Sequence, residues 1–325
     1  MAKVGIIGAG LAGLTLASRL AGTADVTLFE KARGVSGRMA TRRAEPFSFD
    51  HGAQYFTARS QPFQDFIAPY VERGLLADWE PHFLMMEAGK APLTADKHGP
   101  HYVGVPHMNA FLKAVAEPFS ILLECQIARI EPGEDGVVLL DRDGTQHGPF
   151  DWVISTAPAA QSHQLMPHAF SGHDALDTAR VMGCFTLMLG YHRTLSPEFD
   201  GLFVEGSPVG WIANNASKPG RDGPASIVVH STNEWAEAHM EDNPDEVART
   251  LLEEASNLTG LDLTSPDHQD LHRWRYAFVT RTAGHPYLID PGHRLAACGD
   301  WCIDGRVESA FLSADKLAHA LSEQL

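Results

Sequence analysis

The chain has 325 residues, of which 44% are hydrophobic and 20% charged, and 41 acidic against 25 basic residues give a formal net charge of −16. This length predicts about two globular domains, and so acidic a surface repels nucleic acids and anionic membranes, so neither is an expected partner. Four cysteines without CxxC or zinc-finger spacing exclude a disulfide scaffold, and the apolar run near the N-terminus is too short for a signal peptide or a membrane span. We expect a soluble, cytoplasmic protein.

The N-terminal region predicts a β–α–β unit. Residues 3–7 form a short β-branched run that ends in glycine, residues 11–20 place leucines at helical spacing, and residues 26–29 form a second apolar run. Short apolar runs of this kind are typical of buried strands, and the leucine spacing is typical of a helix with one apolar face. Their order and lengths match a mononucleotide-binding unit.

A GxGxxG motif lies between the first predicted strand and the helix. Gly8 allows the tight turn, Gly10 lets the backbone approach a pyrophosphate, and Gly13 permits close packing of helix on strand. The free N–H groups at the helix N-terminus attract the anion. Glu30 follows Gly10 by 20 residues, at the end of the second strand, where a carboxylate accepts hydrogen bonds from adenosine ribose hydroxyls. These features predict a bound dinucleotide.

The sequence RGVSGRM at residues 33–39 indicates which dinucleotide is bound. An NAD dehydrogenase has no use for a second turn of glycine and arginine here, whereas extended FAD runs past this loop along the carboxyl edge of the sheet. Gly37 would allow close approach of the backbone, and Arg38 would reach the pyrophosphate or a flavin oxygen. The alternative is a solvated basic turn, but its position directly after the first motif favours FAD.

The middle of the chain predicts a mixture of helices and strands. The predicted helices and strands have apolar residues at the matching periods and cover residues 62–71, 107–115 and 243–258 as helices, and 121–123, 137–140, 152–155, 185–191, 202–204 and 227–229 as strands. Asn243 is a suitable N-cap for the helix that follows it, with Pro244 in the first turn. The two HGP triplets, at residues 98–100 and 147–149, indicate turns.

The C-terminal region returns to strand, turn and helix, over residues 294–298, 299–305 and 307–321. Asp300, which follows the strand and a glycine, is placed to accept hydrogen bonds from the ribityl hydroxyls of FAD. The helix after it would direct its positive end at the N1–C2=O region of the flavin, which gains negative charge on reduction. Three such motifs in this order specify an FAD-binding fold better than any one of them.

These elements predict an α/β fold in which a Rossmann-type FAD-binding domain carries an inserted, mixed α/β substrate domain. The FAD-binding domain is expected to use both ends of the chain and part of the middle, residues 1–60, 102–165 and 286–325. The substrate domain is expected to comprise residues 61–101 and 166–285.

Three further segments carry a resemblance to a known family: FDHGAQYFTAR (residues 49–59), HRWRYA (272–277) and CGDWCIDGRVESAFLS (298–313). With them the chain resembles, essentially end to end, the bacterial renalases, which belong to the flavin amine-oxidase-like group with a p-hydroxybenzoate-hydroxylase-type fold. The segment WIANNASKPGRD (211–222) is similar as well. The sequence departs from the family at Ser36, where the first of two glycines is usual, and this departure concerns the geometry of the loop.

The resemblance implies oxidation of the 2- and 6-dihydro isomers of NAD(P), in which hydride passes to non-covalently bound FAD and then to O2, giving NAD(P)+ and H2O2. The FAD contacts that it implies are Ala12, Glu30, Arg38, Gln54, Tyr55, Asp300 and Val307. The substrate-binding residues that it implies are Tyr55, Phe56, Thr57, Ala58 and Arg59.

The residue types agree with a dihydronicotinamide dinucleotide as substrate. Stacking of the ring on flavin needs flat apolar walls, for which Tyr55, Phe56, Trp274 and Trp301 are candidates, and Arg59 is a candidate contact for the anion. Core packing is the alternative for each aromatic residue, and a surface position is the alternative for the arginine. Hydride transfer from a dihydronicotinamide needs no general base, so we assign no catalytic residue. The scattered histidines predict no metal site.

Two other functions share the cofactor motifs. The first is an FAD-dependent amine oxidase, but many such relatives attach FAD through a cysteine or pair two tyrosines, and this chain has no Cys–Tyr dipeptide and only six tyrosines. The second is a flavin-binding scaffold or sensor without enzymatic activity, although nothing in the sequence adds a partner module.

Overall fold

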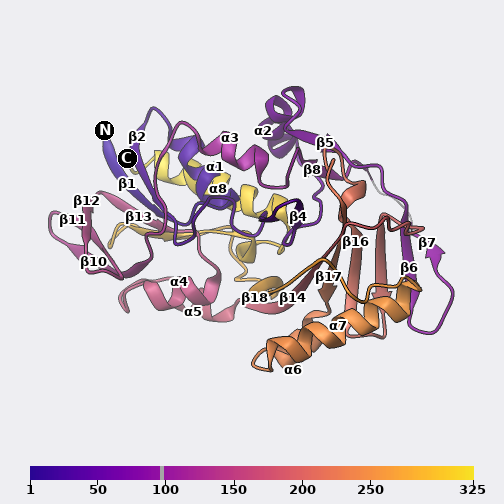
Figure 1. Ribbon diagram of the computed structural model, residues 1–325. Helices are drawn as coiled ribbons and strands as arrows, with labels where there is room; N and C mark the ends of the chain where they lie inside the picture. Colours follow the sequence, from indigo (N-terminus) through magenta and orange to yellow (C-terminus); the bar gives the residue numbers. More distant parts are fainter. Residues whose placement is uncertain (96–98) are drawn as a thin grey trace. The chain divides into compact units, whose positions relative to one another are not determined.

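The computed structural model of the protein describes residues 1–95 and 99–325 (Figure 1). The chain divides into two compact units. The first unit comprises Met1–Arg38, Leu112–Val181 and Val279–Leu325, and the second comprises Met39–Phe111 and Met182–Phe278. The chain therefore passes from one unit to the other four times.

The first unit is built on a six-stranded sheet with the order β19-β20-β13-β1-β2-β9, in which neighbours are parallel except for β19 beside β20. Its strands are β1 (Ala2–Ile7), β2 (Ala24–Phe29), β9 (Ser120–Leu122), β13 (Trp152–Ser155), β19 (Leu288–Asp290) and β20 (Leu295–Ala297). Every residue of β13 and β20 is buried, as is usual for parallel strands that are covered on both faces. Helices α1 (Leu11–Leu20) and α8 (Val307–Ser322) pack against each other.

The first unit also holds a three-stranded antiparallel sheet of β10, β11 and β12. Its smaller elements are β10 (Ile127–Gly133), β11 (Gly136–Asp141), β12 (Gln146–Phe150), α4 (Ala159–Leu165), α5 (His173–Thr178) and the 3-10 helix η2 (Asp300–Cys302). Side chains from both sheets and from η2, among them Phe29, Leu139 and Trp301, form one hydrophobic core.

The second unit is built on a seven-stranded sheet with the order β18-β14-β17-β16-β15-β6-β7. Its strands are β6 (Phe83–Glu87), β7 (Leu93–Thr94), β14 (Arg180–Tyr191), β15 (Gly201–Glu205), β16 (Val209–Asn214), β17 (Ala225–Ser231) and β18 (His268–Arg281). Its helices α6 (Asn233–His239) and α7 (Pro244–Thr259) share a core with the sheet, because the apolar face of α7, with Val247, Leu251 and Ala255, packs among residues such as Val229. The side chain of Asn243 accepts a hydrogen bond from the Asp245 amide, as an N-cap does.

Short elements complete the second unit. They are β3 (Thr41–Ala44), β4 (Phe47–Asp50), α2 (Gln61–Glu72), β5 (Leu76–Asp78), β8 (Tyr102–Gly104), η1 (Asn215–Ser217) and α3 (Ala110–Ala116), which continues into the first unit. Strands β3 and β4 form an antiparallel hairpin, and β4 contacts β17.

The predicted α/β fold class with an N-terminal Rossmann-type unit is confirmed, and the helix at residues 11–20 and the strand at 152–155 have the predicted bounds. Two predictions were wrong in part. Residues 147–149 lie in β12, because the turn that precedes this strand falls earlier, around Gly144 with its φ of +83°; position 98, in the other predicted turn, lies outside the described residues. The helix predicted at 107–115 begins at Ala110. The Met108 amide lies before the helix and donates a hydrogen bond to the Asp50 carboxylate.

The bounds of the two units differ from the predicted domain bounds. Residues 39–60 and 102–111 belong to the second unit, whereas residues 166–181 and 279–285 belong to the first. The reasons lie in packing, since the side chain of Asn215 donates to the Ser48 carbonyl of the hairpin, and Leu176 lies in the first unit's core. Within residues 1–95 and 99–325, no helix combines the length and the apolar character needed to cross a membrane.

Candidate active site

The glycines of the GxGxxG turn fall into two groups by what surrounds them. Gly8 has a φ of +106°, and a Cβ there would lie 2.6 Å from the Thr156 hydroxyl oxygen. A Cβ on Gly13 would lie 2.0 Å from the carbonyl oxygen of Gly8. Both positions therefore require glycine for the fold itself, because the strand, the turn and α1 could not otherwise pack.

Gly10 is different, because the protein leaves space around it. A Cβ on Gly10 would have the Gly37 Cα as its nearest neighbour, at 3.8 Å. The loop that carries Gly37 is held against the turn by a hydrogen bond of 2.9 Å from the Ser36 amide to the Ala9 carbonyl. The two glycine-bearing turns thus face each other across an open cradle that a side chain would fill, which fits the close approach of a pyrophosphate to bare backbone.

Ser36 keeps the backbone conformation that a glycine would have in this loop. Its φ is +105°, in a region that residues with a Cβ rarely adopt, and it is 3% exposed. The departure from the double glycine therefore leaves the loop in a glycine-like conformation at the cost of local strain.

Glu30 is oriented by two backbone amides. Its Oε2 accepts from the Ala9 amide at 2.9 Å and its Oε1 accepts from the Ala32 amide at 2.8 Å, and the residue is 8% exposed. Each carboxylate oxygen keeps a further lone pair, so the group can still accept hydrogen bonds from ribose hydroxyls at the end of β2.

Arg38 and Asp300 form an ion pair with each other, which the sequence did not indicate. The guanidinium lies 2.5 Å from Asp300 Oδ1, and the side chains are 33% and 5% exposed. The backbone carbonyl of Asp300 accepts hydrogen bonds from the amides of Asp304 and Gly305, each at 3.1 Å. These bonds form the turn that precedes α8, which begins at Val307. Burial lowers the pKa of Arg38, but the charge of Asp300 outweighs that effect and the net direction is upward.

The predicted substrate-binding stretch divides between core and surface of the second unit. Phe56 is 3% exposed and packs on Phe63 and Phe111, so it is a core residue here. Arg59 is exposed, and Thr57 and Ala58, its neighbours in the chain, are partly exposed.

Tyr55 lies in an aromatic environment within the same unit. Its ring is 4.5 Å from that of His101 and 5.4 Å from that of Phe83, measured between centroids. Burial raises the pKa of its hydroxyl. Trp301, a predicted wall, is instead part of the first unit's core, where its Nε1 donates to the Ala157 carbonyl at 3.0 Å.

The second unit holds a buried ionic network that sequence reasoning missed. Asp50 Oδ2 lies 2.5 Å from the Arg221 guanidinium and 3.4 Å from the Lys218 ammonium, and all three side chains are at most 3% exposed. Asp50 Oδ1 accepts from the Thr41 hydroxyl and the Met108 amide. Burial raises the pKa of Asp50, but the positive charges of Lys218 and Arg221 outweigh that effect and lower the pKa to about 2. Two cations therefore share one carboxylate.

Lys218 links this network to Gln54. Its Nζ donates to Gln54 Oε1 at 3.1 Å, and Gln54 Nε2 lies 3.3 Å from His230 Nε2. Burial lowers the pKa of Lys218 to about 8, with Asp50 acting in the opposite direction. Burial, with the charge of Lys218, lowers the pKa of His230 to about 3. The predicted FAD contacts of Gln54 and Tyr55 stay predictions.

An aromatic cluster in the same unit joins β18 to the segment after β4. The rings of His51, His272 and Trp274 lie 4.3–5.2 Å apart, and Trp274 Nε1 donates to the His51 carbonyl at 2.9 Å. Burial, assisted by His272 and Arg42, lowers the pKa of His51 to about 4. The imidazoles of His51 and His230 are therefore neutral at physiological pH and weak as bases.

The signal for the network was present in the sequence but was diffuse. Lys218 and Arg221 stand in WIANNASKPGRD, and Asp50 stands in FDHGAQYFTAR. Lysine and arginine between Asn, Pro and Gly suggest an exposed loop, and nothing in the spacing pairs them with a carboxylate that is 168 residues from Lys218 and 171 residues from Arg221. A cavity of about 410 Å³ lies beside Arg221, lined also by Arg43, Glu45, Pro46, Phe47, Ser48, His107, Gly220, Asp222 and Gly223. Residues 54–59 do not line it.

Comparison with known families identifies the chain. Residues 60–322 match the model of the family described as flavin containing amine oxidoreductase, and residues 6–70 match that of an NAD(P)-binding Rossmann-like domain. The chain belongs to the flavin containing amine oxidoreductase family. Membership makes it an enzyme of the flavin-containing oxidoreductases and implies a flavin cofactor. Glu30, the cradle at Gly10 and the turn at Asp300 fit that group chemically.

Solved structures agree in fold. A "Putative protoporphyrinogen oxidase" from Exiguobacterium sp. 255-15 is similar with a TM-score of 0.80 and 13% identity, covering 100% of this chain and 99% of that one. A putrescine oxidase triple mutant from a redesign of cofactor binding has a TM-score of 0.75, 13% identity and the same coverage. Among curated proteins, the 4,4'-diapophytoene desaturase (4,4'-diaponeurosporene-forming) of Staphylococcus aureus strain Newman is 37% identical over 76 residues. That match spans only 20% of this chain and 15% of the desaturase.

Proposed function

We propose that this family member binds FAD non-covalently and oxidises the 2- and 6-dihydro isomers of NAD(P) to NAD(P)+, with O2 as electron acceptor and H2O2 as product. When bound, FAD supplies the acceptor for the hydride and the route of electrons to O2. The proposal rests on the resemblance to the bacterial renalases and on the distribution of charge around the groups that would hold cofactor and substrate.

The first unit supplies the groups that hold FAD. Gly10 and Gly37 leave room for the pyrophosphate, with the N-terminus of α1 directed at it, and Ala12 lies in the first turn of that helix. Glu30, fixed by two amides, accepts from the adenosine ribose. Asp300, which is paired with Arg38, would accept from the ribityl hydroxyls, and α8, which begins at Val307, would direct its positive end at the flavin.

The observation that carries the choice of substrate is the buried excess of positive charge in the second unit. Lys218 and Arg221 face one carboxylate, Asp50, and Gln54 joins them to the stretch with Tyr55 and Arg59. A field of this sign repels an ammonium group and attracts an electron-rich, anionic dinucleotide. The proposed roles are that Arg59 contacts the substrate's phosphates and that Tyr55, Thr57 and Ala58 line the nicotinamide.

The two neutral histidines support the same reaction. His51 and His230 have pKa values of about 4 and about 3, so both are poor general bases at physiological pH. Transfer of hydride from a dihydronicotinamide requires no proton to be removed, and alignment of the ring supplies most of the catalysis. Trp274, stacked on His51, is a flat surface suited to that alignment.

An amine oxidase is the second candidate, favoured by the match of residues 60–322 to the amine oxidoreductase family. The two candidates predict different electron donors. In anaerobic mixing, 6-dihydro-NAD is expected to bleach the visible flavin absorbance in a fast single phase, whereas putrescine, benzylamine and ordinary NADH leave it unchanged. Admission of air then restores the colour with one H2O2 per NAD+. Bleaching by an amine, with none by the dihydro isomers, would transfer the assignment to the second candidate.

The cofactor is tested separately by denaturation. Precipitation of the purified protein is expected to release a yellow compound that co-migrates with authentic FAD and to leave a colourless pellet. A pellet that remains yellow would contradict non-covalent attachment, and released riboflavin phosphate in place of FAD would contradict the role given to Glu30.

A further inference from the structure

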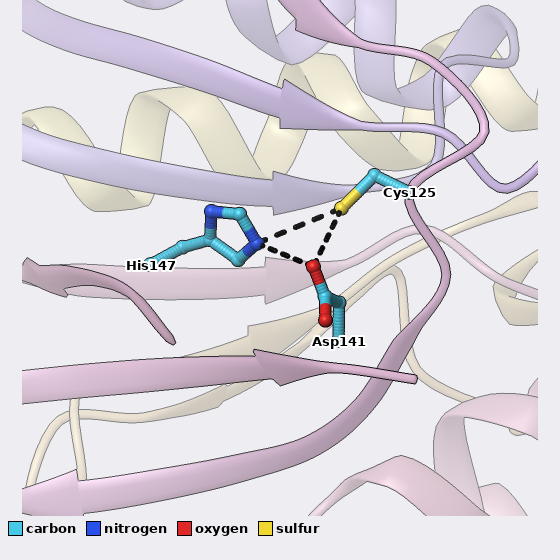
Figure 2. Close-up of side chains that lie close together, drawn as sticks. All are labelled: Cys125, Asp141 and His147. Atoms are coloured by element: carbon cyan, nitrogen blue, oxygen red, sulfur yellow. Dashed lines mark hydrogen bonds and ion pairs between the residues drawn. The ribbon is translucent and has the colours of Figure 1, made fainter. Parts of the chain in front are cut away.

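Three side chains with metal-binding atoms converge in the first unit, on the side of the small antiparallel sheet (Figure 2). Cys125 lies just before β10, Asp141 ends β11 and His147 lies in β12. Cys125 Sγ is 3.8 Å from Asp141 Oδ2 and 3.7 Å from His147 Nε2, and Oδ2 and Nε2 are 2.9 Å apart. None of the three has a role in the proposed oxidation.

The arrangement differs from a catalytic relay of cysteine, histidine and aspartate. In such a relay, the acid and the nucleophile contact opposite nitrogens of the imidazole, so that a proton passes across the ring. Here the same nitrogen, Nε2, faces both the Asp141 carboxylate and the Cys125 sulfur. Three ligand atoms directed at one point, as Figure 2 shows, match the first coordination sphere of a metal ion.

The distances fit a tetrahedral ion of zinc type. Zinc bonds of about 2.3 Å to sulfur and about 2.0–2.1 Å to nitrogen and oxygen place tetrahedral ligands roughly 3.3–3.6 Å apart. The two separations that involve Sγ, 3.7 and 3.8 Å, are slightly longer than this, and the contact of 2.9 Å between Oδ2 and Nε2 is a hydrogen bond that an ion would open. Small side-chain rotations therefore suffice to bind the ion.

The carboxylate is already oriented for ligation. Asp141 Oδ1 accepts from the amides of Asp143 and Thr145, at 3.0 and 2.8 Å, which leaves Oδ2 directed at Cys125 and His147. Supporting hydrogen bonds of this kind are what hold metal ligands in place. The side chains of His147 and Asp141 are 16% and 11% exposed, so an ion can enter from solvent.

The electrostatics of the cluster leave room for a cation. The sulfur of Cys125 and the carboxylate of Asp141 face each other at 3.8 Å, and a divalent cation between them would interact favourably with both. The thiolate and imidazole select a borderline-soft ion over Mg²⁺ or Ca²⁺, which prefer oxygen ligands alone.

We propose that Cys125, Asp141 and His147 form a three-ligand binding site for a thiophilic divalent cation of the zinc class, with a fourth position open to water. The site adjoins the cofactor region through the backbone, because the amides of Glu124 and Cys125 donate to the carbonyls of Ala32 and Glu30, each at 3.0 Å. A bound ion would therefore restrain Glu124 and Cys125, which are hydrogen-bonded to the residues that follow β2.

Equilibrium dialysis of the chelator-treated flavoprotein of 325 residues against Zn²⁺, with the metal measured by atomic emission, tests the site. We expect one Zn²⁺ per chain in the wild type and affinity at least about tenfold weaker in both Cys125→Ser and His147→Gln. Cys184→Ser and His319→Gln are matched controls that are expected to bind as the wild type does. Tight binding retained by either cluster variant, equal losses in the controls, or absence of binding in the wild type would each overturn the proposal.

A second readout identifies the sulfur ligand. Co²⁺ added to the metal-free flavoprotein is expected to produce a thiolate charge-transfer band in the difference spectrum, and Cys125→Ser is expected to lack the band while keeping the flavin spectrum. An unchanged flavin spectrum shows that the variant is folded. Because both measurements follow the metal and not flavin reduction, they are independent of the proposed oxidation.

Discussion

The carboxylates described in the two units are held in different ways. In the first unit, Glu30 is held by two backbone amides, and Asp300 by an arginine that is one-third exposed. In the second unit, Asp50 is enclosed by Lys218 and Arg221, with all three side chains nearly inaccessible to solvent. An exposed partner can turn toward a ligand at little cost, whereas an enclosed ion pair cannot separate without leaving a buried charge. The first arrangement suits binding and release, and the second sets a fixed field.

The largest expected effect is on the enclosed network. Asp50→Asn leaves two buried cations without their carboxylate and is expected to lower the free energy of unfolding by about 3–5 kcal/mol, measured by denaturant titration. Asp262→Asn, at an exposed aspartate, is the control and is expected to leave the transition in place. A variant of Asp50 as stable as the wild type would show that the network is not enclosed.

The glycine cradle gives the next effect, on binding and not on folding. Gly10→Ala adds a Cβ whose nearest protein atom is 3.8 Å away, so the fold should tolerate it, while FAD affinity is expected to fall by at least about tenfold. Gly13→Ala places its Cβ 2.0 Å from a backbone carbonyl, and it is expected to destabilise the protein itself. FAD titration and thermal unfolding of both variants separate the two roles. Normal FAD affinity in Gly10→Ala would contradict a role for the Gly10 cradle in binding the cofactor.

The pH dependence of substrate binding tests the fixed field. Lys218 is charged below its pKa of about 8 and neutral above it, so the excess positive charge of the network is lost as pH rises through that value. On the proposed function, KM for the dihydronicotinamide dinucleotide is expected to rise about threefold between roughly pH 7 and pH 9. The Lys218→Met variant should show a flat profile with KM already high. A wild-type KM that does not change over this range would separate the network from substrate recognition.

The smallest effect is expected at Ser36. Glycine at this position removes the strain of a φ of +105°, partly offset by the greater freedom of glycine in the unfolded chain, so Ser36→Gly is expected to stabilise the protein by about 0.5 kcal/mol. Ser36→Ala keeps the Cβ and serves as the control. Thermal unfolding without flavin measures both, and a lower melting temperature for Ser36→Gly would mean that the serine side chain contributes more than its backbone costs.

Those parts of the fold that depend on residues close together in the sequence were predictable from the sequence. The strand–turn–helix at Gly8 to Gly13 and the helix at 307–322 follow from glycine spacing and helical periodicity, which act over a few residues. The β3–β4 hairpin and the 14-residue strand β18 were not predicted. Strand β18 mixes arginine and histidine with apolar residues, and its place in the sheet depends on pairing with β14, a strand far away in the sequence.

The candidate site was predictable to a similar extent. Glu30 could be placed because its distance from the glycine turn is fixed by a helix and a strand. The pairing of Arg38 with Asp300, and that of Asp50 with Lys218, join residues that lie far apart in the chain, and no local pattern encodes them. The cluster of Cys125, Asp141 and His147 was missed for another reason: its histidine was assigned to a turn, although it lies on a strand opposite Leu139.

The chain passes between the units four times, and this has a consequence for how the protein can evolve. Neither half of the protein is encoded by one uninterrupted stretch of gene, and both termini belong to the same half. No single uninterrupted segment therefore carries the whole of the seven-stranded unit, which consists of Met39–Phe111 and Met182–Phe278. We therefore expect substrate preference to change more readily by point substitutions and loop changes within a unit than by exchange of one contiguous segment.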